Sequence, residues 1–200
     1  MLESIKEYWY LWLVLVALLV LLVFVLKKAS AAAAKRNEIM KQQRENMEHF
    51  KAVYEKYKDT DKAFAGNSDA KELAEGITTV LQYSLEKSDN PDAEFENAPE
   101  WKKNVYALYY FDEDCKTSLS FFFRNNGEPL PSVAVNALKT VGADKLYSTV
   151  AQMYSMYDEN NENVSLDKNR VAELDEKFIS IYNSDEFFDL VKEYILNNIS

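Results

Sequence analysis

One run near the start of the chain carries no charge at all. Residues 8–26, YWYLWLVLVALLVLLVFVL, are apolar or aromatic throughout. A helix of ~19 residues extends about 28 Å, close to the ~30 Å hydrocarbon core of a bilayer. Aromatic rings cluster at one end of the run, where they favour a membrane interface. The run therefore predicts a single transmembrane helix, preceded by a short tail of residues 1–7.

Basic residues are distributed unevenly around this run. Lys27, Lys28, Lys35 and Arg36 follow it, whereas Lys6 alone precedes it. Because cytoplasmic flanks carry the excess of Lys and Arg, we expect a single-pass protein of the inner (cytoplasmic) membrane with its C-terminal domain in the cytoplasm. A cleaved signal peptide is the alternative, since the small residues ASAAAA come next. The apolar core of such a peptide is usually shorter, ~7 to 15 residues, which favours an uncleaved anchor.

Residues 27–58 have the composition of a helical connector. They contain no Gly or Pro and are rich in Ala, Lys, Glu and Gln, which favour helix. Helical spacing places one apolar seam along this helix: Met40, Met47, Phe50, Tyr54 and Tyr57. The seam either pairs with a second copy, giving a homo-oligomer, or docks on the domain that follows. Two heptads are fewer than the three or four typical of a coiled coil, so docking is favoured.

The remaining residues, 59–200, are long enough for one domain with its own core. Carboxylates outnumber basic side chains in this part by about two to one, and the whole chain has a formal charge of −10. Such a surface repels nucleic acid and attracts basic partners, so no direct nucleic-acid binding is expected. The alternative is that the surplus carboxylates only keep the domain soluble. Cys115 is the single cysteine, which excludes an intramolecular disulfide.

Apolar spacing within residues 59–200 predicts an all-α domain. Side chains recurring every three or four residues predict successive helices around residues 73–85, 101–109, 119–123, 131–142, 146–157, 171–182 and 187–195. The polar stretches KDTDKAFAGNSD and KSDNPDAEFENAP predict a boundary turn and a loop.

The stretch SLSFFFRNNGEPLPS, residues 118–132, sets three phenylalanines against a turn. It fits a short helix or a buried strand, and helix is favoured because no second clear strand exists to pair with it. Asn125, Asn126 and Gly127 tolerate the left-handed conformation that ends many helices. Pro131 suits the first turn of the next helix. The phenylalanines are therefore expected in the core, beside a chain corner.

Two segments together resemble a known family. They are SFFFRNNGEPLPSVAVNALKTVGADKLYSTVAQMY and AELDEKFISIYNSDEFFDLVKEYILNNI. Their order and spacing resemble an all-helical bacterial family of largely unknown function, whose best-known member is a double-stranded-DNA mimic protein. The likeness covers roughly residues 70–200. The resemblance implies the fold and, less directly, binding of a partner by carboxylates that imitate phosphates.

The family's motif maps onto this chain residue by residue. The positions that match it are Glu113 for the acidic residue, Phe122 and Phe123 for the aromatics, Asn125 for the turn, and Ala137-Leu138 and Gly142-Ala143 for the closing pairs. The family's Gly-Gly-aromatic element is replaced here by Thr117, Ser118 and Leu119. This departure weakens any function tied to the corner.

No enzyme and no cofactor are predicted. The sequence lacks a Gly-rich phosphate loop and a metal-binding spacing of His and Cys, and His49 lies in the connector. Carboxylate pairs could be drawn from Asp112, Glu113 and Asp114, or from Asp185, Glu186 and Asp189. Acidic runs are more often solvated faces.

Two functions follow from these observations. The favoured one is a membrane-anchored, cytoplasm-facing module that captures a basic, DNA-binding protein, with the acidic loops DAEFE, FDEDC and YDENNEN as candidate contributors to the contacts. The predicted partner-binding residues are Asp112, Glu113, Asp114, Asp158 and Glu159. The alternative is a structural scaffold that self-associates through the connector. Salt separates the two, because charge-driven binding weakens with ionic strength and apolar association does not.

Overall fold

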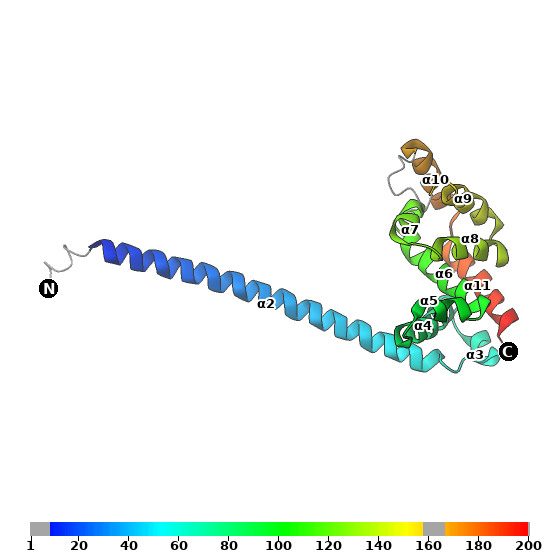
Figure 1. Cartoon of the computed structure of the whole chain (residues 1–200), viewed down its shortest axis with the longest axis horizontal. Helices are drawn as coiled ribbons and strands as arrows, with labels where there is room; N and C mark the ends of the chain where they lie inside the picture. The colour runs from blue at the N-terminus through cyan, green and yellow to red at the C-terminus, as the bar shows by residue number, and fades with distance from the viewer. Residues whose placement is uncertain (1–8, 158–166, 200) are drawn as a thin grey trace. The chain divides into compact units, whose positions relative to one another are not determined.

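The computed structural model describes residues 9–157 and 167–199 (Figure 1). Every regular element in these ranges is a helix, which confirms the all-α fold class. Contacts divide the chain into two units, Met1–Phe50 and Lys51–Ser200, which are described separately.

The first unit consists of most of one long helix, α2 (Trp9–Tyr57). In the ranges that the structure describes, no helix combines the length and apolar character needed to cross a bilayer. The transmembrane helix predicted at 8–26 is therefore wrong, and so is the single-pass inner-membrane location inferred from it. The apolar residues are not a separate element, because α2 runs on through Lys27 and Lys28 without a break.

The second unit contains nine described helices (Figure 1). Their bounds are α3 (Lys62–Asn67), α4 (Ala70–Lys87), α5 (Pro91–Asn97), α6 (Glu100–Cys115), α7 (Leu119–Asn125), α8 (Leu130–Thr140), α9 (Asp144–Tyr154), α10 (Lys168–Ile181) and α11 (Ser184–Asn198). Helix α6 packs against α4, α7, α8 and α11, and α9 lies against α8 and α10. The second unit is therefore built around α6.

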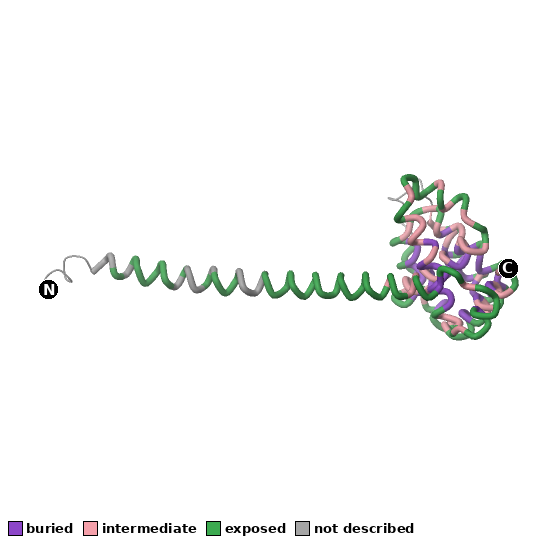
Figure 2. Tube along the Cα trace, turned by 90° about the horizontal axis from the view of Figure 1, so that it is seen from below, coloured by how far each residue is buried: buried purple, intermediate pink, exposed green. Residues whose placement is uncertain are grey.

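Phenylalanines form the centre of the core, which Figure 2 shows as the buried interior of the domain. The ring of Phe111 on α6 lies 5.2 Å from that of Phe122, 5.7 Å from Phe178 and 6.1 Å from Phe187, centroid to centroid. All four are nearly inaccessible to solvent. The helix predicted for SLSFFF is confirmed as α7, which brings Phe122 into this cluster.

Individual residues mark several helix ends, and Pro131 lies where it was predicted. Asp69 caps α4, Asn183 caps α11, and Pro131 lies in the first turn of α8. Gly142 ends α8 with a φ of 80°. The left-handed turn predicted after α7 is wrong, because Asn126 is extended, with φ −121° and ψ 134°. Its side-chain amide bonds the Phe122 carbonyl instead, at 2.8 Å, which satisfies the helix end without a left-handed residue.

Two short helices occupy stretches predicted as turn and loop. The Asp61 carboxylate accepts the Phe64 amide at 2.7 Å and starts α3. The Asn90 side chain accepts the Ala93 amide at 3.2 Å and starts α5, with Pro91 in its first turn. Both are N-caps of the ordinary kind, so a cap residue was the signal available in the sequence.

The C-terminal part of the connector seam docks, as favoured. The ring of Tyr54 stacks on that of Tyr83 at 4.0 Å, and Tyr57 is 2% exposed. Met40 and Met47, by contrast, are each 59% exposed. Docking therefore holds for the two tyrosines of the seam and does not account for the two methionines.

Candidate functional site: the carboxylates of the helical domain

Three of the predicted partner-binding residues lie in the last turn of α6. The side chain of Asp112 is 1% exposed and that of Glu113 is 36% exposed, while Asp114 is partly exposed. The helix places consecutive residues on different sides, so the acidic run is not one surface. Asp158 and Glu159 lie outside the described residues.

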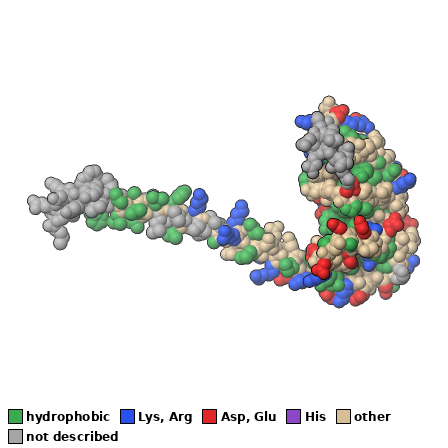
Figure 3. All heavy atoms as spheres, viewed as in Figure 1, with side chains coloured by type: hydrophobic (Ala, Val, Ile, Leu, Met, Phe, Trp, Pro, Cys, Tyr) green, Lys and Arg blue, Asp and Glu red, His purple; other side chains and the backbone are tan. Residues whose placement is uncertain are grey.

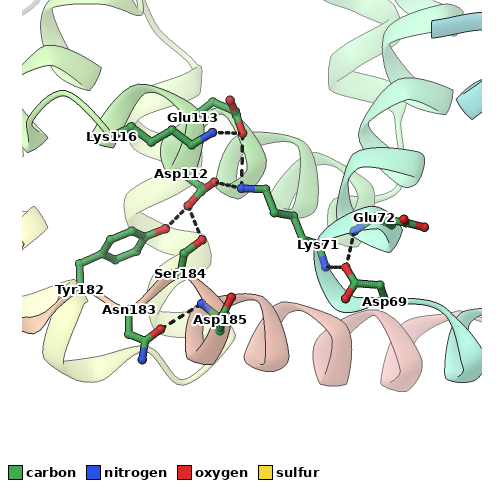
Figure 4. A network of polar contacts seen from close by, with 10 residues as sticks. All are labelled: Asp69, Lys71, Glu72, Asp112, Glu113, Lys116, Tyr182, Asn183, Ser184 and Asp185. Carbon is green, nitrogen blue, oxygen red and sulfur yellow. Dashed lines mark hydrogen bonds and ion pairs between the residues drawn. The ribbon is translucent and has the colours of Figure 1, made fainter. Parts of the chain in front are cut away.

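Asp112 is the centre of a polar network that joins α4, α6 and the start of α11 (Figure 4). Lys71 Nζ donates to its Oδ2 at 2.8 Å. The hydroxyls of Tyr182 and Ser184 both donate to its Oδ1, that of Ser184 at 2.8 Å. Both carboxylate oxygens are therefore occupied by neighbouring side chains.

The network determines the charge states of its members. Burial alone would raise the pKa of Asp112, but the hydrogen bonds from Lys71, Tyr182 and Ser184 outweigh it, and the pKa is lowered. Burial lowers the pKa of Lys71, but the bond to Asp112 and the nearby negative charges raise it overall. Burial and the bond to Asp112 raise the pKa of Tyr182. Asp112 is thus an ionised, fully paired carboxylate with a structural role.

The two neighbouring carboxylates are also engaged. Glu113 Oε1 lies 2.5 Å from Lys116 Nζ and 3.6 Å from Lys71 Nζ. Asp114 Oδ2 accepts the Asn126 side-chain amide at 2.6 Å. Asp114 therefore ties the end of α6 to the end of α7, and Glu113 is the more accessible acid for a partner.

A second group of carboxylates lies on the outer face of α11. Glu186, Asp189 and Glu193 are exposed and recur every three or four residues, and Asp185 is exposed beside them. These four residues are called the α11 stripe below. The basic residue of this helix, Lys192, turns away and donates from Nζ to the Ser68 carbonyl at 2.6 Å. Sequence reasoning noted three of these acids only as an enzymatic alternative, although their helical spacing was visible.

A third group lies on α5 and its flanks. Asp92, Glu94 and Glu96 are exposed on this short helix, and Glu100 follows at the start of α6. Of the two lysines that follow, Lys103 donates to the Glu96 carbonyl oxygen at 3.0 Å, and Lys102 Nζ lies 5.4 Å from the ring centroid of Trp101. In the segment from α5 to the start of α6, the acidic charge therefore reaches solvent.

The site offers little support for metal chemistry. Within residues 9–157 and 167–199, no cluster of three His, Cys, Asp or Glu side chains could hold a metal ion. The described carboxylates are arranged along helix faces and do not converge on one point. Such an arrangement suits contact with an extended, positively charged surface.

Comparisons with known proteins give one match. A family model described as DMP19-like protein matches residues 96–198, which span α6 to α11 and the α11 stripe. The match includes Asp112, Tyr182 and Ser184 of the polar network, whereas Lys71 on α4 lies outside it. No curated protein and no solved structure matches the chain.

Proposed function

Because the chain belongs to the DMP19-like protein family, we propose that its helical domain is a DNA-mimic-like module that binds a basic, DNA-binding protein. The family resembled by this sequence has a double-stranded-DNA mimic as its best-known member. Family membership supports the fold more strongly than the activity, so the proposal rests on the arrangement of charge.

One observation carries the proposal: near α11, two lysines are engaged by groups outside the α11 stripe, whose carboxylates are exposed. Lys192 is bound to the Ser68 carbonyl, and Lys71 is bound to Asp112 while lying 5.1 Å from the ring centroid of Phe188. Neither ammonium group pairs with a carboxylate of the α11 stripe in these contacts. The stripe therefore keeps its negative charge for a partner.

The spacing of the stripe is compatible with recognition of a phosphate-binding surface. Glu186 to Glu193 spans about 10 Å of helix and carries three carboxylates, or roughly one per 5 Å. One strand of B-DNA carries a charge every ~3.4 Å along its axis. The carboxylates are sparser than phosphates, but they are held on a rigid helix. A surface of Lys and Arg that follows a duplex could bridge several of them.

The proposal is tested by affinity capture with the full chain as bait. The variant Glu186→Gln/Asp189→Asn/Glu193→Gln removes three charges from the α11 stripe. The matched control Glu38→Gln/Glu45→Gln/Glu48→Gln removes three from α2. We expect a DNA-binding protein from an extract of the native cells to be retained by the wild type and the control. It should be lost with the stripe variant and released by salt or by duplex DNA.

The opposite pattern would overturn the proposal. A retained protein that ignores duplex DNA, or that binds the stripe variant as well as the wild type, does not recognise this surface. Retention of nothing basic at low salt would leave the carboxylates as a solubility feature. Far-UV circular dichroism of the stripe variant verifies that the helices are intact.

A second candidate function is a scaffold formed by self-association of α2. The observation that favours it is the exposure of Ile39, Met40 and Met47, at 46%, 59% and 59%. Apolar association of this kind resists salt, so sedimentation velocity of the full chain should detect oligomers at low and high ionic strength alike. The variant Met40→Gln/Met47→Gln should then shift the chain toward monomer. Unchanged oligomers in that variant would exclude this seam as the contact.

A further inference from the structure

Four aromatic rings form a continuous series on α5 and α6. Phe95 lies 5.7 Å from Tyr106, Tyr106 lies 4.8 Å from Tyr110, and Tyr110 lies 5.9 Å from Tyr109, centroid to centroid. All four are half-buried, so part of each ring meets solvent. They are distinct from the phenylalanine cluster around Phe111, which solvent hardly reaches.

Negative charges on α4 and α6 act on the tyrosines of this series. Burial raises the pKa of Tyr109, and the negative charges of Glu75 and Glu113 raise it further. Burial also raises the pKa of Tyr106, and the negative charge of Glu86 acts in the same direction. For both tyrosines, burial is the larger cause and the negative charges act in the same direction. The surface is thus built of neutral, electron-rich rings among negative charges.

A hydrogen-bonded chain fixes one side of the surface. Tyr110 donates its hydroxyl proton to Gln82 Oε1 at 3.1 Å, and Gln82 Nε2 donates to Glu86 Oε1 at 3.0 Å. Glu86 Oε1 is thereby oriented on α4, opposite the tyrosines of α6. We name this group of Phe95, Tyr106, Tyr109, Tyr110, Glu75 and Glu86 the tyrosine–carboxylate surface.

Basic residues are few along the helices that carry these rings, and two lysines near the end of α6, Lys71 of α4 and Lys116, are engaged with Glu113. α5 has no basic residue, α6 has none between Lys103 and its end, and α4 has none between Lys71 and Lys87. Figure 3 shows Asp and Glu side chains interspersed with hydrophobic ones on the face of the domain that carries these helices. Lys87 Nζ lies 5.6 Å from the ring centroid of Tyr83, which is not one of the four rings.

We infer that the tyrosine–carboxylate surface binds an arginine-rich segment of the basic partner in preference to a lysine-rich one. This inference rests on the proposed function and adds the chemistry of the contact. A guanidinium is planar and weakly hydrated, so it stacks on an aromatic face while its N–H groups reach a carboxylate. A lysine ammonium is a compact and strongly hydrated charge, so it loses more on leaving water. Charge alone would not distinguish the two.

The experiment compares an oligo-arginine and an oligo-lysine peptide of equal length and charge. Their affinities for the full chain are measured by isothermal titration calorimetry at ~0.15 M salt, where exposed charges are partly screened. We expect the arginine peptide to bind about three- to tenfold more tightly, because a few cation–π contacts with the rings are strong enough to produce a difference of this size. Tyr106→Leu should reduce this ratio toward one.

Two further variants separate the ring from packing. Tyr106→Phe keeps an aromatic face and should keep the arginine preference. Tyr147→Leu removes another half-buried tyrosine, on α9, whose ring lies 5.9 Å from Lys139 Nζ, and should leave the ratio unchanged. Thermal unfolding of Tyr106→Leu establishes that the domain is folded at the titration temperature.

The outcomes distinguish this inference from the proposed function. Equal affinities of the two peptides, or a ratio that Tyr106→Leu does not alter, would overturn the arginine preference and leave charge-driven binding intact. Binding of neither peptide at low salt would overturn the proposed function, and the inference would fall with it. A ratio that falls for Tyr106→Leu and survives in Tyr106→Phe and Tyr147→Leu supports the surface.

Discussion

The ring of Tyr57 lies directly against the backbone of Gly76, so a Cβ atom at position 76 would fall inside van der Waals contact with the ring. Tyr57 is 2% exposed, and its ring also meets that of Phe64 at 5.4 Å. Gly76 lies in the middle of α4, where glycine is unfavourable for the helix itself. The close approach of a buried ring explains why a residue without a side chain is needed here.

We therefore predict that Gly76→Ala destabilises the domain. Alanine improves helix propensity by up to ~1 kcal/mol, but overpacking a buried contact costs about 1–3 kcal/mol, so the clash prevails. The measurement is urea unfolding followed by circular dichroism. In a Tyr57→Leu background the same substitution should cost less, because the ring is gone. A Gly76→Ala protein more stable than the wild type would show that Tyr57 moves aside freely.

A second glycine prediction uses a matched pair. Gly142 has a φ of 80°, while Gly127 does not have a positive φ, and neither would bring a new Cβ atom near a neighbouring side chain. Gly142→Ala should cost about 1–2 kcal/mol in unfolding free energy from backbone strain alone. Gly127→Ala should be neutral or slightly stabilising. Equal effects in chemical denaturation would contradict the assignment of the left-handed residue to Gly142.

The sequence was sufficient for the core of the fold but not for its corners. Helical spacing placed Leu119, Phe122 and Phe123 on one face, and all three are buried, as expected when removal of apolar side chains from water is the main favourable contribution to folding. The turn after them was misjudged, since Asn126 can satisfy the Phe122 carbonyl with its own side chain. The composition of this turn permits either a left-handed residue or a side-chain cap. In the structure Asn126 forms the cap and also bonds Asp114, which is distant along the chain from the turn.

The candidate site was harder to predict than the fold. The acidic run at the end of α6 indicated a cluster, but Lys71 and Tyr182 lie far from Asp112 in sequence, so its burial could not be foreseen. The α11 stripe needed only helical periodicity, whereas the inward turn of Lys192 needed the fold. The apolar run of α2 led to the opposite kind of error, a prediction of more than the structure contains. Its composition suggested a separate transmembrane helix, whereas the structure has one continuous helix that does not meet the requirements for a membrane span.

Cys115 should be unreactive in the native protein. Its side chain is buried, and this burial is the largest cause that raises the pKa of the thiol. The negative charges of Asp114 and Asp112 raise it further. Since the thiolate is the reactive form, a thiol reagent such as Ellman's reagent should modify it slowly at neutral pH. Modification in denaturing urea should be rapid and supplies the control. Complete reaction of the native protein during mixing would mean that Cys115 is accessible.

The ion pair between buried Asp112 and partly exposed Lys71 leads to the last prediction, a loss of stability in Asp112→Asn. The substitution keeps the shape of the side chain but leaves Lys71 without its partner and weakens the bonds from Tyr182 and Ser184. At neutral pH we expect the free energy of unfolding to fall by about 2–4 kcal/mol, as when one partner of a buried charged contact is removed. Urea unfolding of the two proteins measures the difference directly.

The same substitution should reveal a dependence on pH. The folded pKa of Asp112 lies below its ordinary value, so its contribution is fully present above the unfolded pKa of ~3.9 and declines as the pH falls through the folded pKa. The difference in unfolding free energy between the wild type and Asp112→Asn should therefore be constant from neutral pH down to about pH 5. It should become smaller in more acidic solution. The control Asp144→Asn, at an exposed residue in the first turn of α9, should give a small gap throughout. A gap for Asp112→Asn that widens on acidification would mean that Asp112 is held protonated in the folded state, and that Lys71 is not its ionic partner.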